Sequence, residues 1–335
     1  MVNFKNNVSL LPYNTFGVDV NTSSFIKVKK TDDLLSALKK KSSENFLVIG
    51  QGSNILFTKD FPGLTILMDN HGKEIIKENR KEVIIKVQSG ENWHEFVLWC
   101  LKNNYGGVEN LALIPGKVGG APIQNIGAYG VEIKDVFLSC NTLEISSLTF
   151  KEFNLKECNF RYRDSIFKSE LKGKYIIISV TLKLQKYPHN LNTSYGDLEK
   201  MLEGKKKTIQ NIAESIIKIR SSKLPDPKIL GNCGSFFKNP IILKSKLKNL
   251  KKTFKEVPFY PHTKDKIKIP AAWIIEKLGY KGYNENNVGV YKNHSLVLIN
   301  LGNAKGKDVK LLAEKIRSEA FNVFSISLEY EVNIW

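Results

Sequence analysis

The sequence predicts a chain of the α+β class arranged in two domains. Short β-rich apolar runs bounded by glycine or proline alternate with amphipathic segments. The 335 residues, 42% of them hydrophobic, exceed the length of roughly 250–300 residues at which a single core stops growing. A helical pattern then meets Lys223-Leu224-Pro225-Asp226-Pro227, which cannot continue a helix. We therefore expect one domain over 1–219 and a second over 220–335, with the last strand able to return to the first domain.

The first half predicts two helices and four strands. One helix begins at Thr31-Asp32-Asp33, whose polar side chains can cap the leucines that follow. Another begins after Asn92 and ends at Gly106-Gly107. Strands are predicted where β-branched residues cluster between turn residues, at 46–50, 64–68, 83–90 and 175–184.

The second half continues this mixture. Isoleucines three and four positions apart predict a helix over 208–222, immediately before the domain boundary. The remaining elements are expected as a helix at 270–278, a strand at 295–301, a helix at 308–320 and a last strand at 327–334.

The charge balance is strongly basic, with 51 Lys and Arg against 33 Asp and Glu and a net charge of +18 at pH 7. Five of the basic residues are arginines, so an arginine in this lysine-rich chain points to a position that needs its planar fork. The lysine runs at 205–207 and 244–255 are interpreted as solvated faces. Nucleic acid is not an expected partner, because the interleaved basic and aromatic pattern of an RNA-binding surface is missing.

Targeting and metal signals are also missing. No apolar run approaches the roughly 18–20 residues of a membrane span, and the first sixteen residues lack a secretory signal. We therefore expect a cytoplasmic protein without membrane insertion, and a monomer. The cysteines form no CxxC pair and no cluster with histidine, which predicts free thiols and no metal site; they are Cys100, Cys140, Cys158 and Cys233.

The first chemical signal is the glycine motif Gly50-Gln51-Gly52-Ser53-Asn54, which follows an apolar strand. Its backbone N–H groups could cradle a phosphate, and a side chain at Gly52 would obstruct that approach. A Rossmann site is disfavoured, because Ile55 stands where a third glycine is needed and another strand pattern follows. The alternative is a structural glycine hairpin between strands.

The second signal is the glycine-rich loop at 113–130, which carries a single charge, Lys117. A solvent loop of this chain would be expected to hold several charges. A run this small, neutral and irregular favours backbone packed against a large flat group, such as an isoalloxazine edge or a pyrophosphate. An ordinary buried glycine-rich connection would give the same composition.

Taken in order, six segments closely resemble the UDP-N-acetylenolpyruvoylglucosamine reductase family, type I. They are 50–54, 114–132 (IPGKVGGAPIQNIGAYGVE), 162–165, 223–227, 231–240 and 328–332, and Tyr195-Gly196-Asp197-Leu198 resembles the tyrosine loop of the type I subgroup. The resemblance implies an FAD-binding domain of the PCMH or vanillyl-alcohol-oxidase type, followed by an α+β substrate-binding domain. It also implies a reaction of peptidoglycan synthesis, in which NADPH reduces the enolpyruvyl group of UDP-N-acetylenolpyruvoylglucosamine through FAD to give UDP-N-acetylmuramate.

The resemblance also assigns cofactor residues. FAD is expected to bind without a covalent link, because neither glycine segment contains a histidine or cysteine that could form one. The implied cofactor-binding residues are Gly50, Gly52, Ser53, Asn54, Ile114, Pro115, Gly116, Gly119, Gln124, Asn125, Gly127, Ala128 and Tyr129.

Three catalytic residues are implied, and each has a plain structural alternative. Arg163 matches the arginine that faces the substrate carboxylate, but it could form a surface pair with Asp164. Ser235 matches the proton donor, yet a serine after Gly234 is also typical of a turn. Glu331 matches the glutamate; the period of two places Glu329 on the same face, so only the alignment chooses between them.

Substrate binding is implied for Tyr195, Lys223 and Asn239. The chain departs from the usual family residues at Lys117, Gly120, Cys233 and Tyr330, and the 281–290 loop is less glycine-rich than is common. None of these departures removes a catalytic group.

Two other functions compete with this interpretation. An oxidase of the same flavin fold would tether FAD through histidine or cysteine, and an RNA-binding protein would use the +18 charge. Flavin colour would exclude the RNA-binding protein, and bleaching by NADPH would separate reductase from oxidase.

Overall fold

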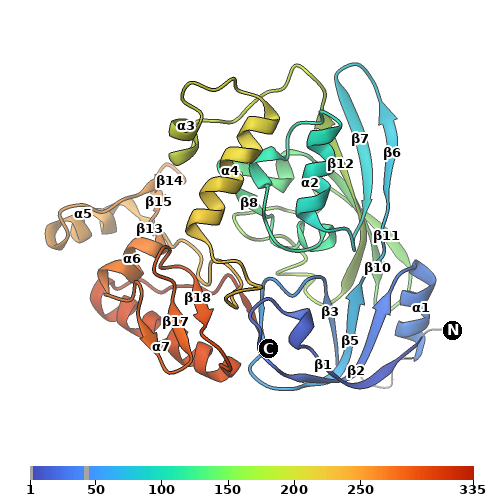
Figure 1. The fold of residues 1–335 in the computed structure, drawn as a ribbon, viewed down its shortest axis with the longest axis horizontal. Coiled ribbons are helices and arrows are strands. Elements are labelled where there is room, and N and C mark those ends of the chain that lie inside the picture. Colours follow the sequence, from blue (N-terminus) through green and yellow to red (C-terminus); the bar gives the residue numbers. More distant parts are fainter. Residues whose placement is uncertain (1–2, 41–44) are drawn as a thin grey trace. The chain divides into compact units, whose positions relative to one another are not determined.

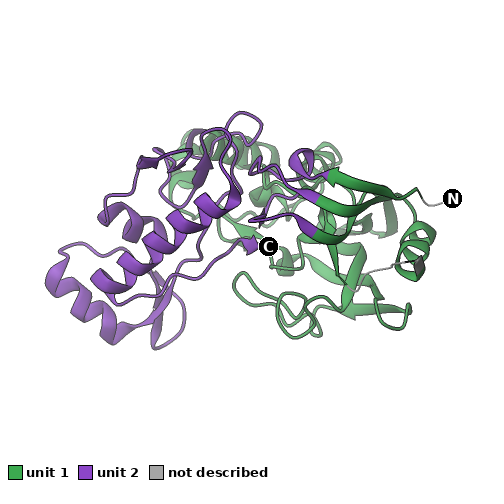
Figure 2. Ribbon diagram, turned by 90° about the horizontal axis from the view of Figure 1, so that it is seen from below, with its two compact units in different colours: residues 1–8, 22–51, 62–221 green, residues 9–21, 52–61, 222–335 purple. Residues whose placement is uncertain are grey.

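A computed structural model describes residues 3–40 and 45–335. The chain divides into two compact units, and neither is continuous in sequence (Figure 2). Unit 1 comprises residues 1–8, 22–51 and 62–221, and unit 2 comprises 9–21, 52–61 and 222–335. The glycine motif therefore spans a unit boundary, which falls between Gln51 and Gly52.

The first sheet has the order β1-β2-β5-β3 and lies largely in unit 1 (Figure 1). It is built from β1 (Lys5–Ser9), β2 (Asn21–Val28), β3 (Phe46–Ile49) and β5 (Phe61–Met68). Helix α1 (Thr31–Lys40) buries Leu34, Ala37 and Leu38 with Ile26 and Ile66 of the sheet. Strands β3 and β5 pair in parallel, and the glycine motif begins at the C-terminal end of β3, an edge strand of this sheet.

A five-stranded antiparallel sheet forms the larger part of unit 1, in the order β11-β10-β12-β7-β6. Its strands are β6 (Lys73–Glu78), β7 (Glu82–Gln88), β10 (Phe137–Glu144), β11 (Phe150–Asn154) and β12 (Tyr175–Gln185). Its core includes side chains of α2 (Trp93–Lys102) and α4 (Ile209–Lys223). The Asn92 side chain caps α2 by accepting the N–H of Glu95, as the sequence predicts.

Unit 2 contains two small sheets, a two-stranded ladder and three helices. Its sheets have the orders β13-β15-β14 and β16-β17-β18. The strands are β4 (Ile55–Leu56), β13 (Ile241–Leu243), β14 (Tyr260–Pro261), β15 (Lys266–Lys268), β16 (Asn284–Glu285), β17 (Val288–Val290), β18 (Leu298–Asn300) and β19 (Asn333–Ile334). The helices are α5 (Lys244–Thr253), α6 (Ala271–Lys277) and α7 (Gly306–Phe324).

The predicted helices and the four strands of the first half are confirmed, with ends shifted by a few residues. The predicted length of the last strand is wrong. Regular pairing covers only β19, which runs parallel to β4, and Tyr330 forms an isolated bridge with Phe237. The expected strand over 327–334 is too long, because residues 329–331 pair with 236–238 only through an isolated bridge, in which Lys238 donates to Glu329 and Glu331 donates to Phe236. The lysine run 244–255 was interpreted only as a solvated face, yet it contains α5, which buries Leu247 and Leu250.

All four cysteines are buried and free of disulfides. No helix in the described residues is long and apolar enough to cross a membrane.

Candidate functional site

The glycine motif has the backbone that a phosphate cradle requires. Gly52 is buried with φ +63°, and a Cβ there would lie 2.0 Å from the carbonyl oxygen of Tyr13. Packing of the chain against Tyr13 therefore already demands glycine, so the position does not report ligand approach alone. Within the described residues, the N–H groups of Gln51 and Gly52 donate no hydrogen bond, which leaves them available to an anion.

The glycine-rich loop is an irregular segment fixed by close contacts within unit 1. Leu113, Asn125 and Tyr129 adopt left-handed backbone angles, which non-glycine residues rarely do. A Cβ at Gly119 would lie 2.5 Å from the Cβ of Ser89, whereas a Cβ at Gly120 would meet nothing within 4 Å. The loop is thus packed on one side and open at Gly120.

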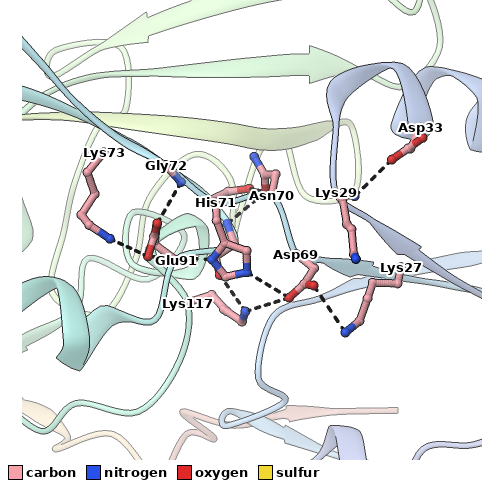
Figure 3. Close-up of polar contacts among 12 residues, drawn as sticks. Lys27, Lys29, Asp33, Asp69, Asn70, His71, Gly72, Lys73, Glu91 and Lys117 are labelled. Atoms are coloured by element: carbon pink, nitrogen blue, oxygen red, sulfur yellow. Dashed lines mark hydrogen bonds and ion pairs between the residues drawn. The ribbon is translucent and has the colours of Figure 1, made fainter.

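The single charge of this loop has a structural partner. The Lys117 ammonium donates to the carbonyl of Gly90 at 2.6 Å. It also pairs with Asp69 at 3.4 Å (Figure 3). A Cβ at Gly50 would lie 2.8 Å from Cγ of Lys117. Lys117 therefore joins the loop to the glycine motif through packing, and Asp69 compensates its charge.

Two carboxylates complete this polar cluster, which Figure 3 shows in full. Burial opposes ionisation of Asp69, but contacts with His71, Lys117 and Lys27 still lower its pKa. Burial likewise opposes ionisation of Glu91, and Lys73 at 3.0 Å together with the Gly72 N–H lowers its pKa. Both groups are therefore held as carboxylates, which supports the base of the loop.

Arg163 lies against the glycine-rich loop. Its backbone is left-handed with φ +54°, and its guanidinium donates to the carbonyl of Gly127. Asp164 pairs with Arg161 at 3.9 Å and forms no ion pair with Arg163. The alternative of a surface pair is therefore wrong, and a strained backbone directs this arginine toward a predicted cofactor segment.

Sequence reasoning missed Arg220, in the last turn of α4. Its Nε has no hydrogen-bond partner in the described part of the chain. Burial lowers the pKa of its guanidinium; the Tyr129 hydroxyl opposes that shift, and the positive charge of Arg163 adds to it. Because arginine is scarce in this sequence, the same signal that singled out Arg163 could have found Arg220.

A buried acceptor without a partner also lies beside Tyr129. The Asn110 amide donates from Nδ2 to the carbonyls of Tyr129 at 2.9 Å and Asn192 at 3.0 Å, while its Oδ1 receives no hydrogen bond from any described residue. Buried polar atoms are rarely left unpaired, so an orphaned cationic donor and an orphaned acceptor fit a ligand with polar edges. Tyr195 lies next to this place, with its ring 5.9 Å from that of Tyr129 in an edge-to-face arrangement.

In unit 2, a short turn holds Ser235. Gly234 has φ +71° and donates its N–H to the Asn232 side chain at 3.0 Å. The next two residues, Phe236 and Phe237, are fully buried, and Ser235 bridges to Val297. The predicted turn with aromatic anchors is therefore present, and it leaves the serine partly exposed.

Glu331 lies beside the Ser235 segment. Its N–H donates to the carbonyl of Phe236 at 3.0 Å. Burial raises the pKa of the Cys233 thiol, and the charge of Glu331 raises it further, so this carboxylate is close to the start of the segment. Glu329, the alternative, is 76% exposed and pairs with Lys238, which favours Glu331 as the site residue.

The predicted substrate residues differ in their surroundings. Asn239 caps α6, because its Oδ1 accepts the N–H of Ala271 at 2.8 Å; its Nδ2 makes no hydrogen bond within the described residues. Lys223 is the exposed last residue of α4. Tyr330, one of the departures, stacks on Phe237 with ring centroids 5.6 Å apart.

Unit 1 thus brings together Arg163, Gly127, Tyr129 and Tyr195, with Arg220 added by the structure. Unit 2 brings together Ser235, Glu331 and Asn54, whose side chain donates to the carbonyl of Glu331. Among the described residues of unit 1, the free N–H of Gln51, the unpaired Nε of Arg220 and the unpaired Oδ1 of Asn110 are polar groups of the kind that a dinucleotide can bind.

Two family models match the chain. A model described as FAD binding domain matches residues 22–145, and one described as UDP-N-acetylenolpyruvoylglucosamine reductase, C-terminal domain, matches residues 226–335. A reductase of that name from Flavobacterium johnsoniae is 48% identical, with 98% of this chain and 99% of the relative covered. One from Amoebophilus asiaticus is 46% identical, with 99% of each covered.

Among solved structures, the reductase of that name from Thermus caldophilus matches all of both chains with a TM-score of 0.72 at 21% identity. Fold and site together define an FAD-dependent oxidoreductase with a PCMH-type cofactor domain, which confirms the expected fold class. The chain belongs to the UDP-N-acetylenolpyruvoylglucosamine reductase family.

Proposed function

We infer that this chain uses NADPH and FAD to reduce the enolpyruvyl group of UDP-N-acetylenolpyruvoylglucosamine, giving UDP-N-acetylmuramate for peptidoglycan synthesis. The observation that carries this inference is the presence of Arg163, Ser235 and Glu331, all in chemically suitable surroundings, within a chain 48% identical to a reductase of that name. We also propose the two-domain division at residue 219, although the compact units exchange two N-terminal segments.

FAD would be held chiefly by backbone. The free N–H groups of Gln51 and Gly52 suit its pyrophosphate, together with Gly50, Ser53 and Asn54. The glycine-rich loop and Arg220 suit its ring system, and the open side of Gly120 leaves space for backbone approach. Bound FAD would supply the hydride-transfer chemistry between NADPH and the substrate.

The catalytic residues act on the substrate. Hydride addition to the enolpyruvyl methylene carbon leaves negative charge on the adjacent carbon, which spreads into the carboxylate. Arg163 is suited to that carboxylate, because a guanidinium binds it through two charge-assisted hydrogen bonds. Ser235 would donate the proton to the adjacent carbon, and Glu331 would orient the reacting group from the neighbouring segment.

Substrate recognition would use the remaining residues. Tyr195 would cover the uridine diphosphate, and Lys223 would neutralise a phosphate. Asn239 can offer only its Nδ2 hydrogens, because its Oδ1 is committed to α6.

The decisive experiment follows the absorbance of the flavin in the absence of oxygen. Purified protein should show flavin absorption, NADPH should bleach it, and the enolpyruvyl substrate should restore it. Bleaching without restoration by that substrate, or restoration by oxygen alone, would favour an oxidase and contradict this proposal.

A further inference from the structure

The part of the glycine motif that belongs to unit 2, residues 52–54, is hydrogen-bonded to both segments that hold the proposed catalytic residues of that unit. One connection runs through Thr15 to Asn232, three residues before Ser235. The other runs directly from Asn54 to Glu331. All of these residues lie in unit 2.

The first connection passes through four hydrogen bonds, the longest of which runs from the Thr15 hydroxyl to the carbonyl of Gly52 at 3.5 Å. The Thr15 N–H donates to the carbonyl of Gly52 at 3.1 Å, and the Asn232 N–H donates to the carbonyl of Thr15 at 2.9 Å. The Thr15 hydroxyl donates to the carbonyl of Asn232 at 2.7 Å. Both backbone groups of Asn232 are thereby fixed to Thr15, so the glycine motif and the Ser235 turn share one support.

Asn232 passes this constraint on to the turn. The residue is 3% exposed, and its Nδ2 donates to the carbonyls of Pro225 and Leu230. Its Oδ1 accepts the N–H of Gly234, the left-handed residue directly before Ser235. Every hydrogen-bonding group of Asn232 is thus engaged, and a shift of Asn232 would move the serine.

The second connection fixes Glu331 from both sides. Its carbonyl accepts from Nδ2 of Asn54 at 3.3 Å, while its N–H donates to Phe236. Asn54 is itself held, because its carbonyl accepts both the N–H and the Nδ2 of Asn333 at 3.1 Å. The parallel pairing of β19 with β4 continues this support to the end of the chain.

We propose that Thr15 and Asn54 are positioning residues, which set the places of Ser235 and Glu331 relative to the glycine motif. The proposal rests on the function inferred above. The Thr15 hydroxyl and the Asn54 amide bind the backbone carbonyls of Asn232 and Glu331, so they act on the catalytic side chains through the backbone. Loss of one such hydrogen bond should lower the rate of proton transfer, because this step requires donor and acceptor within hydrogen-bond reach. A displacement of about 1 Å is enough to slow it strongly.

The first test uses Thr15→Val, which removes the hydroxyl while the shape of the side chain and both backbone bonds remain. Reoxidation of the reduced enzyme by the enolpyruvyl substrate should slow about tenfold, the loss expected for about one hydrogen bond. Substrate affinity and flavin reduction by NADPH should each change less than about twofold. Thr15→Ser should restore the rate because it keeps the hydroxyl.

Thr253→Val is the matched control, since Thr253 is exposed on α5 and its hydroxyl makes no hydrogen bond within the described residues. Wild-type reoxidation in Thr15→Val would overturn the proposal. So would equal slowing of both half-reactions, which means general damage, or a Thr15→Ser variant as slow as Thr15→Val.

Asn54→Ala tests the second connection, with Asn249→Ala on α5 as control. Asn54 is also a proposed cofactor residue, so its rates are compared at saturating FAD. Reoxidation should again slow about tenfold, with faster amide exchange at Glu331 and Asn333. Unchanged exchange together with unchanged reoxidation would overturn this part.

Amide hydrogen exchange tests the positioning role of Thr15 independently of the proposed function. Thr15→Val should speed exchange of the Gly234 N–H in the FAD-loaded protein, whatever substrate the enzyme uses. If wild-type protein fails to reduce the enolpyruvyl substrate but this exchange accelerates, the function is wrong and the positioning stands. If the wild type is active and exchange is unchanged, the positioning is wrong.

Discussion

Two arginines of this lysine-rich protein, Arg163 and Arg220, have unusual local surroundings. Arg163 adopts a left-handed backbone and donates to the carbonyl of Gly127. Arg220 is half-buried, and its buried Nε has no hydrogen-bond partner among the described residues. A buried guanidinium nitrogen without a hydrogen-bond partner costs folding free energy, so its retention favours an anionic or electron-rich ligand. Lysine could not replace either residue without losing the planar fork.

Arg220→Met should weaken FAD binding, because it removes the buried donor and retains the apolar stem. We expect the FAD dissociation constant to rise about 10- to 100-fold, the range for a charge-assisted hydrogen bond. Arg80→Met, on an exposed surface, is the control. Fluorescence titration of flavin-free protein measures the affinity, and urea unfolding of that protein should show no loss of stability. Lower stability with unchanged affinity would mean that Arg220 is structural.

Ser235→Ala should separate the two half-reactions. Flavin reduction by NADPH does not require the serine proton and should persist. Reoxidation by the enolpyruvyl substrate should slow on the order of 10² to 10⁴-fold, the usual contribution of general acid catalysis. Stopped-flow absorbance measures both, with Ser245→Ala on α5 as control. An unchanged second half would point to another acid, such as Glu331.

At the scale of elements, the glycine-rich loop owes its rigidity to its neighbours. Gly119 packs on Ser89 at the end of β7, and Lys117 ties the loop to Gly90 and Asp69. Composition predicted a loop packed against something; the structure supplies protein on one side and an opening at Gly120 on the other. Neither sequence alternative, a ligand platform or a buried connection, was therefore complete.

Acid should lower the stability that Asp69 and Glu91 contribute to the folded protein. The pKa values of Asp69 and Glu91 are lowered in the folded protein, so both groups stabilise it above their ordinary values of 3.8 and 4.5. That stability is lost as pH falls from about 5 through the folded pKa values. Asp69→Asn should lower the free energy of unfolding at pH 7 on the order of 1 kcal/mol, with a smaller difference near pH 3.5.

Urea unfolding at both pH values measures this, with the exposed Glu74→Gln on β6 as control. A constant difference between Asp69→Asn and the wild type at the two pH values would show that Asp69 acts through packing rather than charge.

At the scale of the whole molecule, each of the two compact units is assembled from segments that are separated in the sequence. Segments 9–21 and 52–61 lie in the N-terminal half of the sequence but belong to unit 2 with residues 222–335 (Figure 2). The support for Ser235 and Glu331 therefore comes from residues that a cut at 219 would assign to the other domain. Expression of 220–335 alone would remove Thr15 and Asn54 from this support.

Denaturation should release all FAD from the protein, because neither glycine segment contains a histidine or cysteine that could bind it covalently. Acid precipitation should release all of the flavin into the supernatant, where absorbance quantifies it. Flavin retained on the precipitated chain would contradict this expectation.

The sequence by itself determined the class of the fold and most helices, and it supplied the candidate site residues. Periodicity located α2 and α4, because their apolar faces repeat with the helical period, and Asn92 was recognisable as a cap. The glycine motif and the Ser235 turn were visible because left-handed backbone needs glycine locally.

Only the tertiary structure decided which residues support these motifs. Thr15, Asn110 and Arg220 gain their meaning from partners far away in sequence: the carbonyl of Asn232, the carbonyls of Tyr129 and Asn192, and a buried place beside Tyr129. The same holds for Gly52, where the carbonyl of Tyr13 enforces glycine. Burial and hydrogen-bond satisfaction are properties of the folded chain, and no local pattern of residues encodes them.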